Sequence, residues 1–65
     1  MSVQPEHLTP RERQCLLAVW DAGSQPKAAE AIGLNRETLR THLQNARAKL
    51  GAKTTLEAIK RFLAA

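Results

Sequence analysis

The chain has 65 residues, of which 43% are hydrophobic and 25% are charged, and its formal net charge is +4. This composition is typical of one small globular domain, and because so short a chain buries only roughly 60% of its unfolded surface, we expect a thin core. No apolar run approaches the ~20 residues that cross a bilayer, and the N-terminus lacks a signal peptide, so we expect a cytoplasmic protein with no membrane partner.

The first expected helix begins after Thr9. Pro10 and Glu12 follow at the spacing of a capping box with proline at the first helical position. The apolar residues that recur at helical spacing are Cys15, Leu16, Val19 and Trp20. Gly23 tolerates the left-handed conformation that ends many helices, so the helix should end near Ala22. We expect Trp20 to pack in the core.

Two further helices follow in quick succession. Ser24 can cap the second, with Pro26 in its first turn, and Gly33 should stop it after about two turns. Asn35 can cap the third after only one intervening residue. The third helix carries an apolar stripe of Leu39, Leu43, Ala46 and Leu50.

A fourth helix is expected after Gly51, because Thr54 and Glu57 have the spacing of another capping box. Its large apolar residues are Leu56, Ile59, Phe62 and Leu63. No segment has the alternating pattern of a strand. The sequence therefore predicts an all-α domain of four helices, whose second and third form a helix-turn-helix because the turn between them is so short.

The net positive charge lies in one segment. Between residues 36 and 53, five basic side chains are opposed by Glu37 alone, a difference equal to the whole net charge of +4. The five are Arg36, Arg40, Arg47, Lys49 and Lys53. A basic helix of this kind is either a solvated face or a surface for a negatively charged partner, and its position in a helix-turn-helix favours DNA.

Groups that carry other chemistry are sparse. Cys15 has no disulfide partner and lies among apolar residues, which predicts a buried, unreactive thiol. His7 and His42 are far apart, without the clustered ligands of a metal site. No glycine-rich phosphate loop or catalytic nucleophile motif is present. We therefore expect neither an enzyme nor a protein with a metal, a cofactor or a small-molecule ligand.

Several segments together resemble the LuxR/GerE-type DNA-binding domain. They are LTPRER at residues 8–13, residues 24–33 with Ala29 and Glu30, TLRTH at residues 38–42, and Asn45 followed by KLG at residues 49–51. The family pattern extends over residues 8–64 without a gap, so we expect a tail at residues 1–7 and one domain at residues 8–65. RETLRTHLQNARAKL also resembles region 4 of sigma factors, which binds promoter DNA. The segment GAKTTLEAIKRFL looks like its LuxR/GerE counterpart, which favours that family.

The resemblance implies roles for individual residues. The third helix should enter the major groove of double-stranded DNA, with bases read by Arg40, Thr41 and Gln44. Phosphate contacts are implied for Ser24, Lys27, Arg36, Thr38, His42, Arg47 and Lys49. Lys27 is included because Pro26 occupies the position where the family often has lysine. The fourth helix should pair with that of a second subunit through Leu56, Ile59, Phe62 and Leu63.

Each role has a simpler alternative. His42 could be a histidine at the edge of the core that is hydrogen-bonded to backbone, and the apolar residues of the fourth helix could all be intramolecular core. The side-chain chemistry nevertheless suits DNA. Arginine pairs with guanine, glutamine pairs with adenine, and a threonine methyl packs on the methyl of thymine.

We interpret the chain as a sequence-specific transcriptional regulator, most simply a homodimeric repressor on an inverted repeat with half-sites about one helical turn apart. Only seven residues precede Leu8, so we expect no sensor domain in the same chain. One alternative is an interaction module that heterodimerises with a full-length LuxR-type regulator and antagonises it. The other is a promoter-binding domain like sigma region 4.

Overall fold

The computed structural model describes residues 7–64, so Ala65 and all of the expected tail except His7 lie outside the described part. The described residues form four helices and no strand. They are α1 (Pro10–Ala22), α2 (Gln25–Ile32), α3 (Arg36–Leu50) and α4 (Thr55–Ala64). The predicted all-α fold is confirmed. None of these helices has the length and apolar character needed to cross a membrane.

The helices begin at the expected caps. Thr9 Oγ1 accepts a hydrogen bond from the Glu12 N–H at 3.1 Å, while Glu12 Oε1 accepts from the Thr9 N–H at 2.9 Å. Asn35 Oδ1 accepts from the Thr38 N–H at 2.8 Å at the start of α3. These side chains satisfy N–H groups that the first turn of a helix leaves without a partner.

The cap of α4 differs in one detail from the expected capping box. Thr54 Oγ1 accepts from the Glu57 N–H at 3.0 Å, as predicted. The Glu57 carboxylate, however, accepts from the N–H of Lys53 at 3.3 Å rather than from that of Thr54. The backbone of residue 53 is therefore fastened to the first turn of α4.

The turn between α2 and α3 depends on Gly33, whose φ of 69° lies in the left-handed region that disfavours side chains. The next N–H, that of Leu34, donates to the Ala29 carbonyl at 2.9 Å and closes the end of α2. Asn35, the next residue, is the N-cap of α3. This short connection makes the pair a helix-turn-helix.

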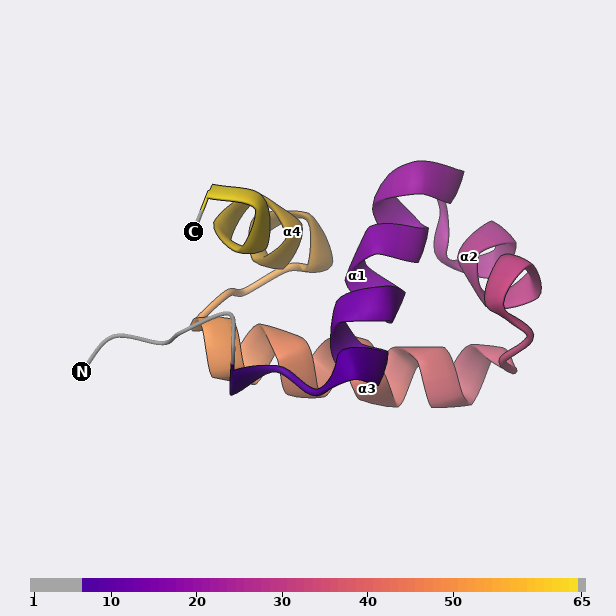
Figure 1. The fold of residues 1–65 in the computed structure, drawn as a ribbon, viewed down its shortest axis with the longest axis horizontal. Helices are drawn as coiled ribbons and strands as arrows, with labels where there is room; N and C mark the ends of the chain where they lie inside the picture. The colour runs from indigo at the N-terminus through magenta and orange to yellow at the C-terminus, as the bar shows by residue number, and fades with distance from the viewer. Residues whose placement is uncertain (1–6, 65) are drawn as a thin grey trace.

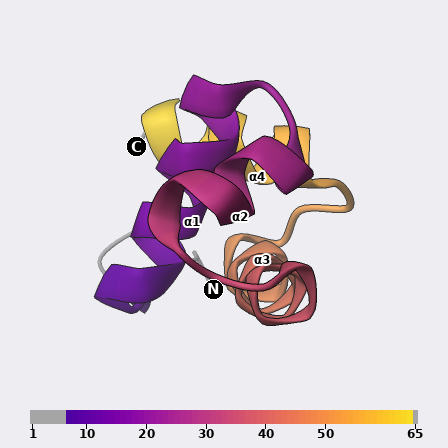
Figure 2. The same cartoon turned by 90° about the vertical axis from the view of Figure 1, so that its right-hand side faces the viewer.

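The third helix lies along one side of the molecule. In Figure 1, α3 runs horizontally along the lower edge and α1 crosses it steeply, with α4 and α2 above its two ends. Figure 2, which views α3 nearly end on, shows α2 and α4 above it and α1 beside it on the left, with the first turn of α1 at the height of α3. The two views agree that no other described helix covers the lower side of α3.

The core fills the space between α3 and the other helices. Its buried apolar residues are Leu8, Cys15, Leu16, Ala28, Ala29, Leu39, Leu43, Ala46, Leu50, Ala58 and Ile59. Many of them are small, as expected for a thin core. Trp20 does not belong to this set: its side chain is 57% exposed, so the prediction that it packs in the core was wrong. Trp20 lies at the edge of the apolar stripe of α1, where the other described residues leave more than half of its side chain in solvent.

Candidate nucleic-acid interface

The helix α3 has one face in the core and one in solvent. The four residues of its predicted apolar stripe, Leu39, Leu43, Ala46 and Leu50, are all buried. Because an α-helix turns by about 100° per residue, the positions between them lie either on the outer face or at the margins of the buried stripe. The stripe therefore fixes which side chains α3 presents on the uncovered side seen in Figures 1 and 2.

The three residues expected to read bases lie on that outer face. Arg40, Thr41 and Gln44 are all exposed. The Thr41 hydroxyl donates to the Glu37 carbonyl at 3.1 Å, one turn back along the helix. Its hydrogen is thus used within α3, and the methyl group of Thr41 remains for an apolar contact.

The outer face also contains residues that the sequence-based assignment missed. Glu37, Asn45 and Ala48 are exposed on α3. By helical geometry, Glu37 and Ala48 lie close to the ridge of Thr41 and Gln44. Positions three or four residues from an assigned base reader were the signal that would have identified them. Glu37 also places a negative charge within an otherwise basic surface.

The residues expected to contact phosphates occupy the margins of this face. Arg36 is exposed, whereas Thr38, His42 and Arg47 are half-buried. By helical geometry, Arg36 and Arg47 lie on the same side as Arg40, and Thr38 and His42 lie on the opposite margin. The two margins are the parts of a helix that would approach the walls of a DNA groove.

Lys49 has an intramolecular partner. Its Nζ lies 2.8 Å from Glu12 Oε1, and the Glu12 side chain is only 4% exposed. Burial raises the pKa of Glu12, but the hydrogen bonds from Lys49 and Thr9 and the positive charge of Lys49 outweigh that effect and lower it from its ordinary value. Lys49 therefore holds α3 against α1.

Ser24 and Lys27, the two phosphate contacts expected at the start of α2, are not part of the outer face of α3. Ser24 caps α2 by accepting from the Lys27 N–H at 3.3 Å, and it lines a cleft shared with Thr55 and Leu56 of α4. Ser24 therefore lies near the first turn of α4. Lys27 is exposed in the first turn of α2.

The apolar residues of α4 divide between the core and the surface. Ile59 is 2% exposed and Phe62 packs partly against the core, whereas Leu56 and Leu63 are 53% and 49% exposed. The assignment of all four to a dimer surface is therefore corrected, because Ile59 is used within the chain. Helical periodicity explains the division: Ala58, Ile59 and Phe62 share the inner face, and Leu56 and Leu63 lie two turns apart on one flank.

No other chemical site competes with this surface in the described part of the chain. Residues 7–64 contain no group of three or more side chains arranged to hold a metal ion. Cys15 is buried, and burial raises the pKa of its thiol, partly opposed by the positive charge of Arg11. The most distinctive surface is therefore the outer face of α3.

Comparison with known proteins identifies the family. Residues 6–50, more than half of the chain, match the family described as Sigma-70, region 4. No curated protein and no solved structure matches the chain. The match ends before GAKTTLEAIKRFL, the segment that favoured the LuxR/GerE type, and so gives that finer assignment no support. The matched family consists of DNA-binding regulatory domains and not of enzymes. The matched residues include α2 and α3, which form the predicted helix-turn-helix. The chain belongs to the sigma-70 region 4 family of helix-turn-helix DNA-binding domains.

Proposed function

We propose that this protein is a sequence-specific regulator of transcription that inserts α3 into the major groove of double-stranded DNA. The observation that carries the proposal is the outer face of α3, where Arg40, Thr41 and Gln44 are exposed on a side that no other described helix covers. The buried stripe on the opposite side holds α3 rigidly to the domain. A rigid helix with a polar outer face has the shape that the major groove admits.

The side chains of this face supply a set of base contacts. Arg40 can donate two hydrogen bonds to guanine, and Gln44 can exchange two with adenine. The free methyl group of Thr41 suits the methyl of thymine. Glu37 adds an acceptor for the amino group of cytosine, so four neighbouring positions of α3 discriminate among bases.

Phosphate contacts set the position of α3 in the groove. Arg36 and Arg47 lie on the margin that also contains Arg40, and the described residues offer neither of them an ion pair. The charge of Lys49 is balanced by Glu12. Arg36 and Arg47 are therefore the main phosphate ligands, with Thr38 and His42 as polar contacts on the opposite margin.

The regulatory mode that we propose is repression by a homodimer that covers promoter DNA at an inverted repeat. The expected interface on α4 is smaller than the sequence implied, because only Leu56 and Leu63 are exposed among its large apolar residues. The LuxR/GerE-type arrangement, in which α4 alone joins two copies, consequently needs additional surface.

A second candidate function follows from the family match. Region 4 of sigma factors binds promoter DNA, so this chain would recognise a single asymmetric promoter element as one copy. Selection of bound sites from random DNA distinguishes the two candidates. Inverted half-sites at fixed spacing support the homodimeric regulator, and a single asymmetric element supports the promoter-binding domain.

The base-reading role of Arg40 is tested by Arg40→Ala in mobility shifts on the selected site and on random DNA. The variant should lose roughly 1 to 3 kcal/mol on the selected site and relax the sequence preference at one position. Lys60→Ala, which removes an exposed charge from α4, is the matched control and should change neither affinity. Equal loss on both DNAs would contradict the base-reading role. The absence of a shift on any DNA would overturn the function and favour a module that antagonises another regulator.

A further inference from the structure

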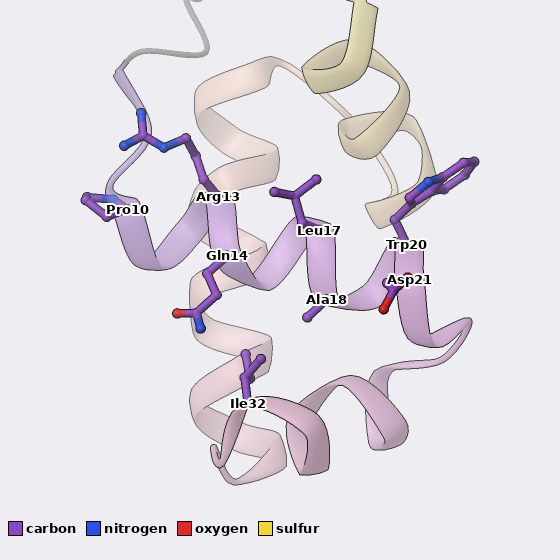
Figure 3. A pocket seen from close by; sticks show the side chains of 8 residues that line it. All are labelled: Pro10, Arg13, Gln14, Leu17, Ala18, Trp20, Asp21 and Ile32. Carbon is purple, nitrogen blue, oxygen red and sulfur yellow. The ribbon is translucent and has the colours of Figure 1, made fainter.

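The exposed face of α1 forms an open groove that the DNA-binding function does not use. Figure 3 shows Leu17 and Trp20 projecting from α1, with Ile32 of α2 below them. Leu17 is 44% exposed and Trp20 is 57% exposed. A domain with so few large apolar residues gains nothing within the chain from leaving two of them in water, and such a patch is typical of an interaction site.

The apolar surface continues from α1 onto α4. Trp20 lines a second cleft together with Leu56 of α4, so the indole connects the groove on α1 with the exposed flank of α4. Leu63 lies two turns further along that flank and is also exposed. The patch thus extends over two helices and is larger than the α4 flank alone.

The charges around Leu17 identify the occupant. Arg13 lies four residues before Leu17 and Asp21 lies four residues after it, so the three form one ridge along α1 with opposite charges at its ends. Neither charge takes part in an ion pair with another described residue. When two copies of this ridge lie antiparallel, the positive end of each faces the negative end of the other, and the two leucines meet at the centre.

We propose that this face of α1 packs against the same face of a second copy of the chain, with the two helices antiparallel and Leu17 on the two-fold axis. Each Arg13 then faces Asp21 of the other copy, and Trp20 covers the apolar centre. Such a contact is isologous, since the same patch serves both partners. Packing between ridges of residues four apart is also the commonest way in which helices cross.

This inference rests on the homodimer in the proposed function and says where the second copy binds. The α1 face adds apolar area to the small exposed area that Leu56 and Leu63 provide on α4. This packing also leaves α3 accessible in both copies, because α3 packs against α1 through the opposite side of that helix. Dimer formation and DNA binding therefore use separate surfaces and can be measured separately.

The experiment uses the full chain and its own fluorescence. The sequence contains one tryptophan and no tyrosine, so emission reports Trp20 alone. Sedimentation velocity across a dilution series should show a monomer–dimer equilibrium, with emission shifting to shorter wavelength as the dimer forms. Arg13→Asp and Asp21→Arg, tested singly, should each raise the dissociation constant by roughly tenfold, because every substitution creates two like-charge pairs across the axis.

The double variant Arg13→Asp/Asp21→Arg restores opposite charges and should recover most of the lost affinity. The matched controls, Arg11→Asp on another face of α1 and Glu30→Arg on α2, change the same charges outside the groove and should leave the equilibrium unchanged. Circular dichroism and urea unfolding of every variant verify that the fold is retained.

Recovery in the double variant would support the interface. The inference is overturned if the chain is monomeric at all concentrations, or if the single and double variants are equally impaired. It is also overturned if only Leu63→Lys dissociates the dimer, which would place the contact on α4, or if Trp20 emission is independent of concentration. Mobility shifts on DNA are made in parallel. DNA binding by a dimer that the charge variants do not affect overturns only this inference. DNA binding without any dimer overturns this inference and the homodimeric mode but not the insertion of α3 into DNA, and a dimer without DNA binding overturns only the proposed DNA binding.

Discussion

Lys49 Nζ and Glu12 Oε1 lie 2.8 Å apart, and this ion pair joins the last turn of α3 to the first turn of α1. The same carboxylate oxygen accepts from the Thr9 N–H in the capping box of α1. One buried side chain thus fixes both the start of α1 and the position of α3 beneath it. The candidate DNA-reading face depends on that position.

Removal of Lys49 should destabilise the fold. Lys49→Met leaves the buried carboxylate of Glu12 without its cation, and we expect the free energy of unfolding to fall by about 2 kcal/mol. The value is below that of a fully buried pair because the Lys49 side chain is 38% exposed. Urea unfolding measures the change. Lys60→Met is the control and should lower stability by less than about 0.5 kcal/mol. Equal effects of the two substitutions would contradict the structural role of Lys49.

Stability should decrease in acid in a manner that depends on Glu12. The pKa of Glu12 is lower in the folded chain than in the unfolded chain, so its contribution is complete above the unfolded value and is lost as the pH falls through the folded one. We expect the urea midpoint to begin to decline below about pH 5. Glu12→Gln should be less stable at neutral pH and show a flatter decline. An unchanged pH profile in that variant would contradict this role.

The salt dependence of DNA binding should separate phosphate ligands from structural cations. If Arg36 and Arg47 contact phosphates, Arg36→Gln and Arg47→Gln should each reduce the slope of log affinity against log salt by roughly 0.9. Lys49→Gln should weaken the fold but leave the slope nearly unchanged, because Lys49 is paired with Glu12. The slopes are measured where unfolding experiments show each variant to be folded. A slope for Lys49→Gln as low as that for Arg47→Gln would instead make Lys49 a phosphate ligand.

The thiol of Cys15 should report unfolding. Cys15 is fully buried and burial raises its pKa, so an aromatic disulfide reagent should react only with molecules that have opened. The chain contains no other cysteine, which makes the signal specific. Lys49→Met should accelerate labelling in proportion to its loss of stability when opening and closing are fast. Labelling of the native protein at the rate of a free thiol would show that the core around Cys15 opens easily.

The helices and their order follow from local signals in the sequence. Thr9, Ser24 and Asn35 cap the first three helices as predicted, and the glycines that follow them take the left-handed conformation. The stripe of α3 is buried throughout, so the outer position of Arg40, Thr41 and Gln44 was also predictable. Such features depend on residues within a few positions of each other along the chain.

Contacts between residues that are far apart in the sequence could not be predicted from such local signals. The sequence suggested Lys49 as a phosphate ligand, and in the structure Lys49 forms an ion pair with Glu12. It also suggested Ile59 as an interface residue, and in the structure Ile59 is buried in the core. A periodic pattern indicates which residues share a helix face, but not how far a neighbouring helix covers that face. Trp20 is the clearest example, since its apolar character predicted burial and its position leaves it exposed.

Local signals were enough to predict the four described helices, the helix-turn-helix and the basic character of α3, because caps, glycines and the 3.6-residue repeat act over a few neighbouring residues. The contact between Glu12 and Lys49 and the exposure of Leu17 and Trp20 became evident only from the folded chain. Burial and ion pairing depend on where helices cross. That arrangement is set by the packing of the whole core rather than by any single segment.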